Sequence, residues 1–146
     1  MAKPKPKSTK TYSKYRSKRT EIDGNKFHSL VEGRRYKELK RQEEKGYIAN
    51  LTLQPRYKIL HPVTKKLICT YVGDFRYERD GRVVVEDVKG VLTDVFRLKA
   101  KLMKQMRVQC PGGEIAEGVD ITIVKSVRQG RGVYVWAVDG VIEDRP

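Results

Sequence analysis

The sequence predicts a mixed α/β domain, and three observations lead to this expectation. A segment that favours helix precedes two apolar segments that favour strand. The pair Asp80-Gly81 then lies between further apolar runs, which is a strong signal for a two-residue hairpin turn. A basic segment with helical periodicity and a final pair of alternating strands complete the order. At 146 residues the chain has the size of one domain with a substantial core.

The first predicted helix covers residues 26–45, and Gly46 is expected to end it. Glu32, near the start of this helix, has two interpretations. Ser29 and Glu32 have the spacing of a capping box, in which the glutamate accepts a hydrogen bond from a backbone amide. A glutamate carried by a helix can also bind a metal ion. The pattern alone leaves capping and metal binding open.

Two strands are predicted next, at Leu51 to Leu60 and at Ile68 to Tyr77. The turn at Asp80-Gly81 joins the second of them to Val83-Val84-Val85-Glu86-Asp87-Val88-Lys89. The three valines that open this segment indicate a strand that is buried on both faces. An acid and a lysine at the end of such a strand point to a functional site, because burying a charge is costly.

Asp74 and Asp87 are predicted to lie directly opposite each other in this hairpin. A two-residue turn at Asp80-Gly81 sets that register, and the alternation of side chains along a strand puts Lys89 on the same face. Opposed carboxylates destabilise a sheet unless a cation neutralises them. The spacing therefore indicates a metal-dependent phosphodiesterase site. Solvation of an exposed pair, or neutralisation by an arginine, is the alternative that spacing alone leaves open.

A second helix is predicted from Thr93 or Asp94 to Met106, followed by a loop at residues 109–118. The polar surface of this helix is basic and carries Arg97, Lys99, Lys101 and Lys104. A basic amphipathic helix is commonly just a solvated face. This one directly follows the segment with Asp87, so its cations are candidates for contacting a substrate.

The chain is predicted to end in a hairpin formed by Val119 to Val124 and Val133 to Val138. Apolar residues occupy every second position of its last strand, at Val133, Val135 and Ala137. This alternation fits a dimer surface and fits core packing equally well, so both interpretations stay open.

The net charge is +14, and the first 19 residues carry eight Lys or Arg and no acid. Such a balance indicates a polyanionic partner, for which nucleic acid is the usual candidate. Residues 1–20 are interpreted as a flexible basic arm and residues 21–146 as the folded domain. Within the arm, basic residues alternate with Tyr12 and Tyr15, a mixture suited to contacting phosphates and stacking on bases. These basic residues are Lys14, Arg16, Lys18 and Arg19. A solubilising tail is the alternative.

Other classes of protein are disfavoured by what the sequence lacks. No apolar run approaches the roughly 18 residues of a membrane span, and no signal-peptide-like segment follows the basic start, so a cytoplasmic protein without a membrane partner is expected. Cys69 and Cys110 are solitary and are interpreted as reduced packing thiols. His28 and His61 are isolated, and no P-loop or Ser-His-Asp constellation competes with the acidic pair.

Four segments in this order carry a resemblance to a known family: Phe27-His-Ser-Leu-Val-Glu32-x-x-x-Tyr36, Leu53-Gln54-Pro55, Gly73-Asp74-Phe75-Arg76-Tyr77 and Glu86-Asp87-Val88-Lys89-Gly90. The order resembles that of the PD-(D/E)XK nuclease superfamily, restriction-endonuclease-like enzymes that include archaeal-type Holliday junction resolvases. The four segments also look like those of a family of small phage-encoded nucleases, over roughly residues 26–104. The resemblance implies a restriction-endonuclease-like mixed sheet flanked by helices, to which the basic arm and the C-terminal hairpin are additions.

The resemblance also implies roles for individual residues. Asp74 and Asp87 would be metal ligands, with the backbone carbonyl of Val88 as a third. Lys89 would be the catalytic lysine. Glu32 would be the helix-borne acid that completes the metal site, and the resemblance favours this role over capping.

The activity implied is that of an Mg²⁺-dependent DNA endonuclease, with Mn²⁺ as a substitute metal. Branched DNA such as a Holliday junction is the first expected substrate, within phage DNA recombination or processing, and a homodimer in the cytoplasm of a bacterial host is expected. Contacts with DNA are expected from Gln54 and from the cations Arg97, Lys99 and Lys101. The alternative is a non-catalytic basic protein that binds nucleic acid and carries an inert acidic pair.

Deleting residues 2–19 should weaken DNA binding without slowing cleavage of saturating DNA. Each phosphate neutralised contributes about −0.9 to the slope of log K against log salt on duplex DNA, so the slope should flatten by roughly three to four if about half the arm charges engage. Salt titrations of binding, with catalytically inactive protein with and without the arm, measure this change. An unchanged slope would show that the arm is a passive tail.

Overall fold

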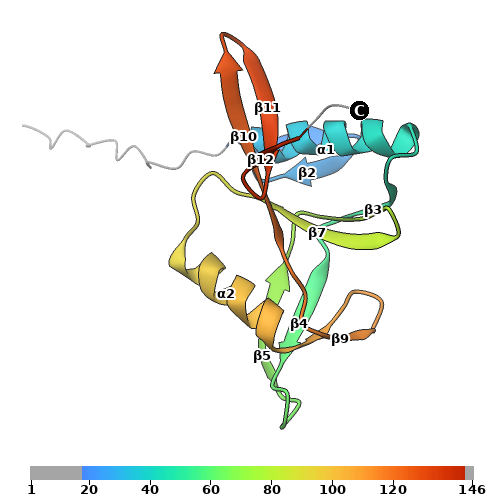
Figure 1. Ribbon diagram of the computed structural model, residues 1–146, viewed down its shortest axis with the longest axis vertical. Helices are drawn as coiled ribbons and strands as arrows, with labels where there is room; N and C mark the ends of the chain where they lie inside the picture. The colour runs from blue at the N-terminus through green and yellow to red at the C-terminus, as the bar shows by residue number, and fades with distance from the viewer. Residues whose placement is uncertain (1–17, 144–146) are drawn as a thin grey trace, which may run out of the picture.

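The computed structural model describes residues 18–143 as a mixed α/β fold with two helices and three open sheets (Figure 1). The helices are α1 (Leu30–Glu44) and α2 (Asp94–Gln105). The strands are β1 (Thr20–Ile22), β2 (Asn25–Phe27), β3 (Ala49–Leu53), β4 (Arg56–Leu60), β5 (Leu67–Val72), β6 (Phe75–Arg79), β7 (Arg82–Val88), β8 (Arg107–Gln109), β9 (Ile115–Glu117), β10 (Thr122–Gly130), β11 (Val133–Val138) and β12 (Val141–Ile142).

The largest sheet has six strands in the order β12-β11-β10-β7-β6-β3. Its neighbours are antiparallel except for β7 and β10, which run parallel and are joined through α2, β8 and β9. A second sheet has the order β5-β4-β8-β9, and β1 with β2 forms a small hairpin. The six-stranded sheet is mixed, as expected, but the part of the chain that the structure describes also contains two further sheets that the sequence did not predict.

The reason for the second sheet is a bend shared by two strands. The predicted strand from Leu51 to Leu60 is interrupted at Gln54-Pro55, and the predicted strand from Ile68 to Tyr77 is interrupted at Gly73-Asp74. Strand β3 pairs with β6, and β4 pairs with β5, in the same register on both sides of the interruption. Gln54 has a φ of 48°, which turns the backbone out of the extended conformation at this point. One long hairpin thus leaves the first sheet and enters the second.

The turn at Asp80-Gly81 has the predicted two-residue form. Both residues have positive φ, 52° and 72°, and Arg79 lies opposite Arg82. The pairing extends to Phe75 opposite Glu86, so the register predicted for the hairpin is confirmed.

The same signal marks a hairpin that we did not predict. Asp23 and Gly24 have φ values of 52° and 75° and join β1 to β2, so Thr20, assigned above to the arm, is the first residue of β1. This hairpin lies on α1 at Gly33, where an added Cβ would lie 2.7 Å from the side chain of Thr20. Glycine at position 33 therefore permits the close approach.

Both helices begin at the capping residues that the sequence indicates. Ser29 caps α1 and accepts a hydrogen bond from the backbone N–H of Glu32, and Thr93 caps α2 in the same way. Helix α1 starts at Leu30 and not at residue 26, because β2 occupies residues 25–27. Gly46, with a φ of 80°, follows its C-terminal end as predicted.

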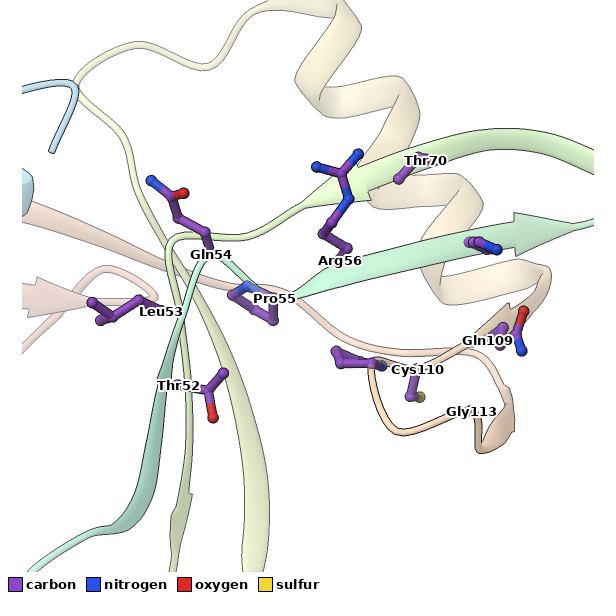
Figure 2. A pocket seen from close by; sticks show the side chains of 11 residues that line it. Thr52, Leu53, Gln54, Pro55, Arg56, Thr70, Gln109, Cys110 and Gly113 are labelled. Atoms are coloured by element: carbon purple, nitrogen blue, oxygen red, sulfur yellow. The ribbon is translucent and has the colours of Figure 1, made fainter. Parts of the chain in front are cut away.

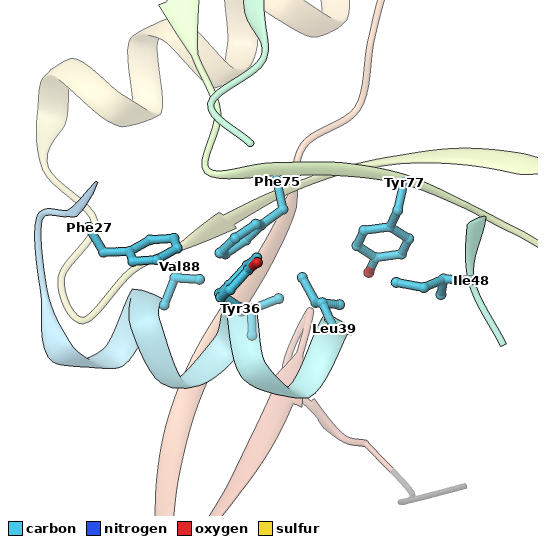
Figure 3. Packing of buried hydrophobic residues seen from close by; sticks show 8 residues of the cluster. Phe27, Tyr36, Leu39, Ile48, Phe75, Tyr77 and Val88 are labelled. Carbon is cyan, nitrogen blue, oxygen red and sulfur yellow. The ribbon is translucent and has the colours of Figure 1, made fainter. Parts of the chain in front are cut away.

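Two apolar clusters lie on opposite faces of β7. Figure 3 shows the first, between α1 and the six-stranded sheet; its buried members are Phe27, Tyr36, Leu39, Ile48, Phe75, Tyr77, Val88 and Val124. The second joins α2 to the other sheet and includes Tyr57, Ile59, Tyr71, Val85, Phe96, Met103 and Val108. Strand β7 contributes Val88 to one cluster and Val85 to the other. Val83 is 54% exposed, so burial on both faces begins at Val85 and not at the first valine.

The predicted loop at residues 109–118 contains strand structure. Strand β8 ends at Gln109, and β9 pairs with β8, which in turn pairs with β4. Three-residue strands are too short to show a periodicity in the sequence. The C-terminal hairpin is confirmed as β10 and β11, although β10 extends six residues beyond the predicted end at Val124. Ala137 is buried while Val133 is 53% exposed, so core packing applies only to the base of the hairpin.

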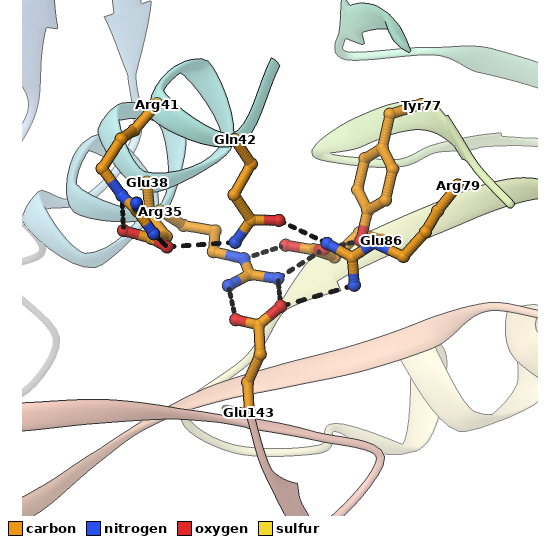
Figure 4. Close-up of polar contacts among 8 residues, drawn as sticks. All are labelled: Arg35, Glu38, Arg41, Gln42, Tyr77, Arg79, Glu86 and Glu143. Carbon is orange, nitrogen blue, oxygen red and sulfur yellow. Dashed lines mark hydrogen bonds and ion pairs between the residues drawn. The ribbon is translucent and has the colours of Figure 1, made fainter. Parts of the chain in front are cut away.

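Arg35 and Glu86 form a fully buried ion pair between α1 and β7 (Figure 4). The guanidinium donates from Nε to Glu86 Oε1 at 2.6 Å and from Nη2 to Glu86 Oε2 at 3.0 Å. Its Nη1 donates to Glu143 Oε2 at 2.6 Å, and Tyr77 Oη donates to Glu86 Oε2 at 2.6 Å. Burial lowers the pKa of Arg35, but the hydrogen bonds and charges of Glu86 and Glu143 raise it by more. The pKa is therefore above its ordinary value, and the side chain stays charged. This network ties the helix, the sheet and the C-terminal segment together.

Replacing Glu86 with glutamine should lower the free energy of unfolding by about 3 kcal/mol or more, because it removes one partner of a buried ion pair. Glu44→Gln, which neutralises an exposed carboxylate on α1, is the matched control and should change the free energy by less than about 0.5 kcal/mol. Urea denaturation followed by circular dichroism measures both values. Equal losses in the two variants would contradict a structural role for the pair.

Candidate functional site

Asp74 lies at the bend where the long hairpin passes from one sheet to the other. Its backbone N–H donates to the carbonyl of Glu86 at 3.1 Å, and its carbonyl accepts from the N–H of Gln54 at 2.9 Å. Its side chain is also held, because Oδ2 accepts from the backbone N–H of Val88 at 2.7 Å. The bend and β7 therefore set the position of this carboxylate.

Asp87 is only 2% exposed, and its two carboxylate oxygens have different surroundings. Oδ2 accepts a hydrogen bond of 2.6 Å from the hydroxyl of Tyr71. Oδ1 lies 3.0 Å from Nζ of Lys89 but outside the direction of a hydrogen bond, so this buried oxygen has no hydrogen-bond donor among the described residues. Burial, and then the charge of Asp87, raise the pKa of Tyr71, so its hydroxyl remains a donor.

Lys89 stands between Asp87 and helix α2. Its Nζ lies 4.9 Å from the centre of the Phe96 ring, and a third of its side chain is exposed. The aromatic face attracts the ammonium group, so the buried Phe96 helps to keep Lys89 beside the carboxylate. The predicted proximity of Asp87 and Lys89 on one face is thus confirmed. Helix α2 helps to maintain it through the contact between Phe96 and Lys89.

Glu32 takes part in capping of α1. Its Oε2 accepts from the backbone N–H of His28 at 3.2 Å, one residue before the capping Ser29. The glutamate also lies close enough to Asp74 for its charge to act there. The capping interpretation is therefore confirmed in this modified form, while metal binding by Glu32 stays a prediction.

The three acids concentrate negative charge at the bend. The pKa of Asp74 is raised to about 8 by burial, and then by the charges of Asp87 and Glu32. The hydrogen bond from Val88 and the charge of Lys89 act in the opposite direction. A cation bound between the acids would relieve the repulsion that raises this pKa.

The donor atoms fit a hard divalent cation. Asp87 Oδ1 is buried without a hydrogen bond, and Asp74 and Glu32 each use one carboxylate oxygen on a backbone amide. Mg²⁺ prefers oxygen ligands and retains several waters, so one or two carboxylates can hold it. Within residues 18–143, however, no three His, Cys, Asp or Glu side chains have the spacing of ligands to one ion. Asp74 and Asp87 are thus the residues that would hold a metal. Val88 contacts Asp74 through its N–H, and the role of its carbonyl stays a prediction.

A groove of about 490 Å³ lies beside the bend (Figure 2). Its lining includes Gln54, Arg56, Lys58, Thr70, Gln109 and Cys110, and none of the described residues that line it carries a carboxylate. Arg56 and Lys58 are both exposed. Gln54 connects this groove to the acids, because its backbone N–H donates to the carbonyl of Asp74. The groove offers positive charge and amide groups next to the acidic cluster.

The other predicted contacts with nucleic acid differ in their surroundings. Arg97 and Lys101 are exposed on α2, whereas Lys99 donates to the carbonyl of Thr70 at 3.2 Å and so joins α2 to β5. Lys18 and Arg19 are exposed just before β1. The remaining arm residues, Lys14 and Arg16, lie outside the described residues.

Sequence reasoning missed Tyr71 and Phe96, which position Asp87 and Lys89. Tyr71 lies 16 residues from Asp87 in the chain, and no motif spacing connects them. Phe96 lies on α2, outside the strand that leads to Lys89, so only the fold brings the two side chains together. The alternation of side chains along β5 is the one sequence feature that could have placed Tyr71 on the buried face of this strand.

The chain belongs to the family described as "Protein of unknown function (DUF1064)", which matches residues 12–121. This match covers most of the chain and ends just before β10. Neither the curated proteins nor the solved structures include a significant match. The described helices are too short and too polar to cross a membrane.

Mg²⁺ or Mn²⁺ should stabilise the protein if Asp74 and Asp87 bind the metal. At about 100 times the Kd, the free energy of unfolding should rise by about 2.7 kcal/mol, because only the folded state offers the site. Asp87→Asn and Asp74→Asn should each remove this metal-dependent gain, measured by thermal melting against the same variant in EDTA. Glu44→Gln should retain it. A gain that survives in both aspartate variants would place the metal elsewhere.

Proposed function

We propose that the protein is an Mg²⁺-dependent DNA endonuclease of the PD-(D/E)XK type. The observation that carries this proposal is the cluster at the bend: Asp74 and Asp87 are fixed beside each other with Lys89 adjacent, and one buried oxygen of Asp87 has no hydrogen-bond donor among the described residues. Burying a carboxylate oxygen that lacks a hydrogen bond is costly even beside the ion pair with Lys89, so this arrangement suits a site that binds a ligand.

The strand order supports a restriction-endonuclease-like core. Strands β3, β6, β7 and β10 are consecutive neighbours, with β10 parallel to β7, and α2 lies in the connection between those two strands. The apolar clusters on opposite faces of β7 place α1 on one side and α2 on the other. This is a mixed sheet flanked by helices, as the resemblance implies, with the second sheet and the C-terminal hairpin added to it.

The side chains of the acidic cluster can each take a separate role in phosphodiester hydrolysis. Asp74 and Asp87 would hold the metal, which when bound lowers the pKa of a coordinated water and withdraws charge from the phosphate. Tyr71 and the N–H of Val88 hold the two carboxylates in place from the outside. Lys89, partly exposed beside Asp87, is positioned to stabilise negative charge that develops on a phosphate.

The charge of the protein supports DNA as the substrate. The chain has a net charge of +14, the groove beside Asp74 exposes Arg56 and Lys58, and α2 exposes Arg97 and Lys101. These cations can neutralise phosphates around the acidic cluster. The family resemblance makes branched DNA in recombination the first substrate to test. It also motivates a homodimer, since two opposed strands of a junction need two sites, and a location in the host cytoplasm.

A non-catalytic nucleic-acid-binding protein is the second candidate. The 3.0 Å contact between Lys89 and Asp87 favours it, because the lysine already supplies one countercharge to the acid. The basic groove and the basic face of α2 would serve such a protein equally well.

Cleavage assays separate these two candidates. The wild type should cut DNA in Mg²⁺ and not in EDTA, with linear, flapped and four-way substrates compared at equal concentration. Asp74→Asn, Asp87→Asn and Lys89→Ala should each reduce cleavage about 100-fold or more while retaining DNA binding. Glu32→Gln should weaken cleavage less, and Glu44→Gln should leave it unchanged.

The outcomes have distinct meanings. A wild-type protein that binds DNA but leaves every substrate intact in Mg²⁺ and Mn²⁺ would be the non-catalytic protein. A monomer by light scattering that cuts linear and branched DNA equally would be a general nuclease and not a junction resolvase.

A further inference from the structure

A second groove lies between α1 and the C-terminal hairpin, apart from the acidic cluster. It has a volume of about 290 Å³. Helix α1 contributes Arg34, Lys37, Glu38 and Arg41, and the hairpin contributes Ser126, Tyr134 and Trp136. Figure 1 shows that β10 and β11 project past α1 as a two-stranded ribbon. The groove lies between α1 and the face of this ribbon that carries Ser126, Tyr134 and Trp136.

The wall formed by α1 carries a surplus of positive charge. Arg34, Lys37 and Arg41 follow at helical spacing along one face, where Glu38 is the single acid among the described residues of the lining. Arg41 and Glu38 form an ion pair of 2.6 Å, whereas Arg34 and Lys37 are exposed. Within residues 18–143, the groove therefore retains two exposed cations that no carboxylate of its lining neutralises by an ion pair.

The ribbon adds a third cation and an aromatic platform. Arg128 lies directly opposite Tyr134 in the pairing of β10 with β11, so both side chains point to the same face. Both are exposed. The guanidinium of Arg34 lies 5.3 Å from the centre of the Tyr134 ring, and that of Arg35 lies 5.2 Å from the Trp136 ring. Tyrosine rings and arginine guanidinium planes are the groups on which unpaired bases stack.

We propose that this groove binds a single strand of nucleic acid. Arg34, Lys37 and Arg128 would contact the phosphates, and a base would stack on the platform formed by Tyr134 and Arg34. A single strand is the partner that these features select, because it offers bases whose faces are free to stack, whereas a duplex keeps them covered. An acidic peptide would be attracted by the cations, but its carboxylates would not stack on the platform of Tyr134 and Arg34.

The inference does not depend on hydrolysis at Asp74 and Asp87. A nuclease could use the groove to hold an unpaired strand near a branch, and a binding protein could use it alone. Binding can therefore be measured in EDTA, where the proposed nuclease is inactive, so failure of one proposal leaves the other intact.

Trp136 makes the groove observable in the unmodified protein. It is the single tryptophan of the sequence and lines the groove, so its fluorescence reports on this site alone. Adding an oligo-dT 20-mer in EDTA should change the Trp136 emission, with the same midpoint as the rise in anisotropy of a labelled oligonucleotide. Binding detected by anisotropy without any change in emission would overturn the proposal, because the strand would then lie elsewhere.

Substitutions with matched controls identify the groups that bind. Tyr134→Ala should weaken oligo-dT binding about fivefold or more, the loss expected for one stacked base, and Tyr134→Phe should retain affinity. Tyr47→Ala, which removes another exposed tyrosine, should have no effect. Full affinity in Tyr134→Ala, or an equal loss in Tyr47→Ala, would overturn the role of the platform.

The cations are tested by salt dependence. Arg34→Gln and Lys37→Gln should each flatten the slope of log K against log salt by about 0.7 on single-stranded DNA. Lys65→Gln, an exposed lysine in the turn between β4 and β5, should leave the slope unchanged. An unlabelled duplex should compete more weakly than unlabelled oligo-dT for the change in Trp136 emission. Stronger competition by the duplex, or by polyglutamate, would overturn the selection of a single strand.

Discussion

Strand β7 buries two consecutive carboxylates, and the different ways in which they are neutralised organise the molecule. Glu86 faces α1 and is fully satisfied by Arg35 and Tyr77, so that this acid holds the helix to the sheet. Asp87 faces the opposite side, where it has one hydrogen bond from Tyr71 and an imperfectly directed lysine. A buried carboxylate is tolerated when hydrogen bonds and an opposite charge satisfy both of its oxygens. A buried carboxylate with one oxygen that lacks a hydrogen bond is a candidate for binding a ligand. The structural acid and the candidate functional acid are thus neighbours with opposite roles.

The bend in the long hairpin is the second constraint, because it brings the acidic cluster to the boundary between two sheets. Gln54 and Asp74 are cross-strand neighbours at the bend, joined by a backbone hydrogen bond. On one side of this point the hairpin packs against α1, and on the other side against α2. The acidic cluster at the bend therefore lies where the apolar cluster on α1 and the apolar cluster on α2 meet. The basic groove is lined by residues on both sides of this bend, from Thr52 to Lys58.

Two basic grooves with different chemistry support the two proposals, a DNA substrate at the bend and a single strand beside the C-terminal ribbon. The groove beside the bend presents cations and amides, which suit a phosphate backbone. The groove beneath the C-terminal ribbon presents cations together with Tyr134 and Trp136, which suit unpaired bases. Helix α1 connects the two regions, since the charge of Glu32 in its first turn raises the pKa of Asp74 and Arg34 lies in the second groove. The family match covers the helix and ends before the ribbon.

The sequence by itself determined the features that depend on neighbouring residues. Asp80-Gly81 set the turn and hence the register of the hairpin, and the caps of both helices followed from Ser29 and Thr93. Only the tertiary structure decided that the predicted strands break at the bend, and that Tyr71 and Arg35 donate hydrogen bonds to the two buried acids, from 16 and 51 residues away. Periodicity reports which face of a strand is apolar, but not which sheet the strand joins or what packs on that face. The sheet that a strand joins, and the residues that pack on its apolar face, depend on how residues far apart in the chain together bury their charges and apolar surface.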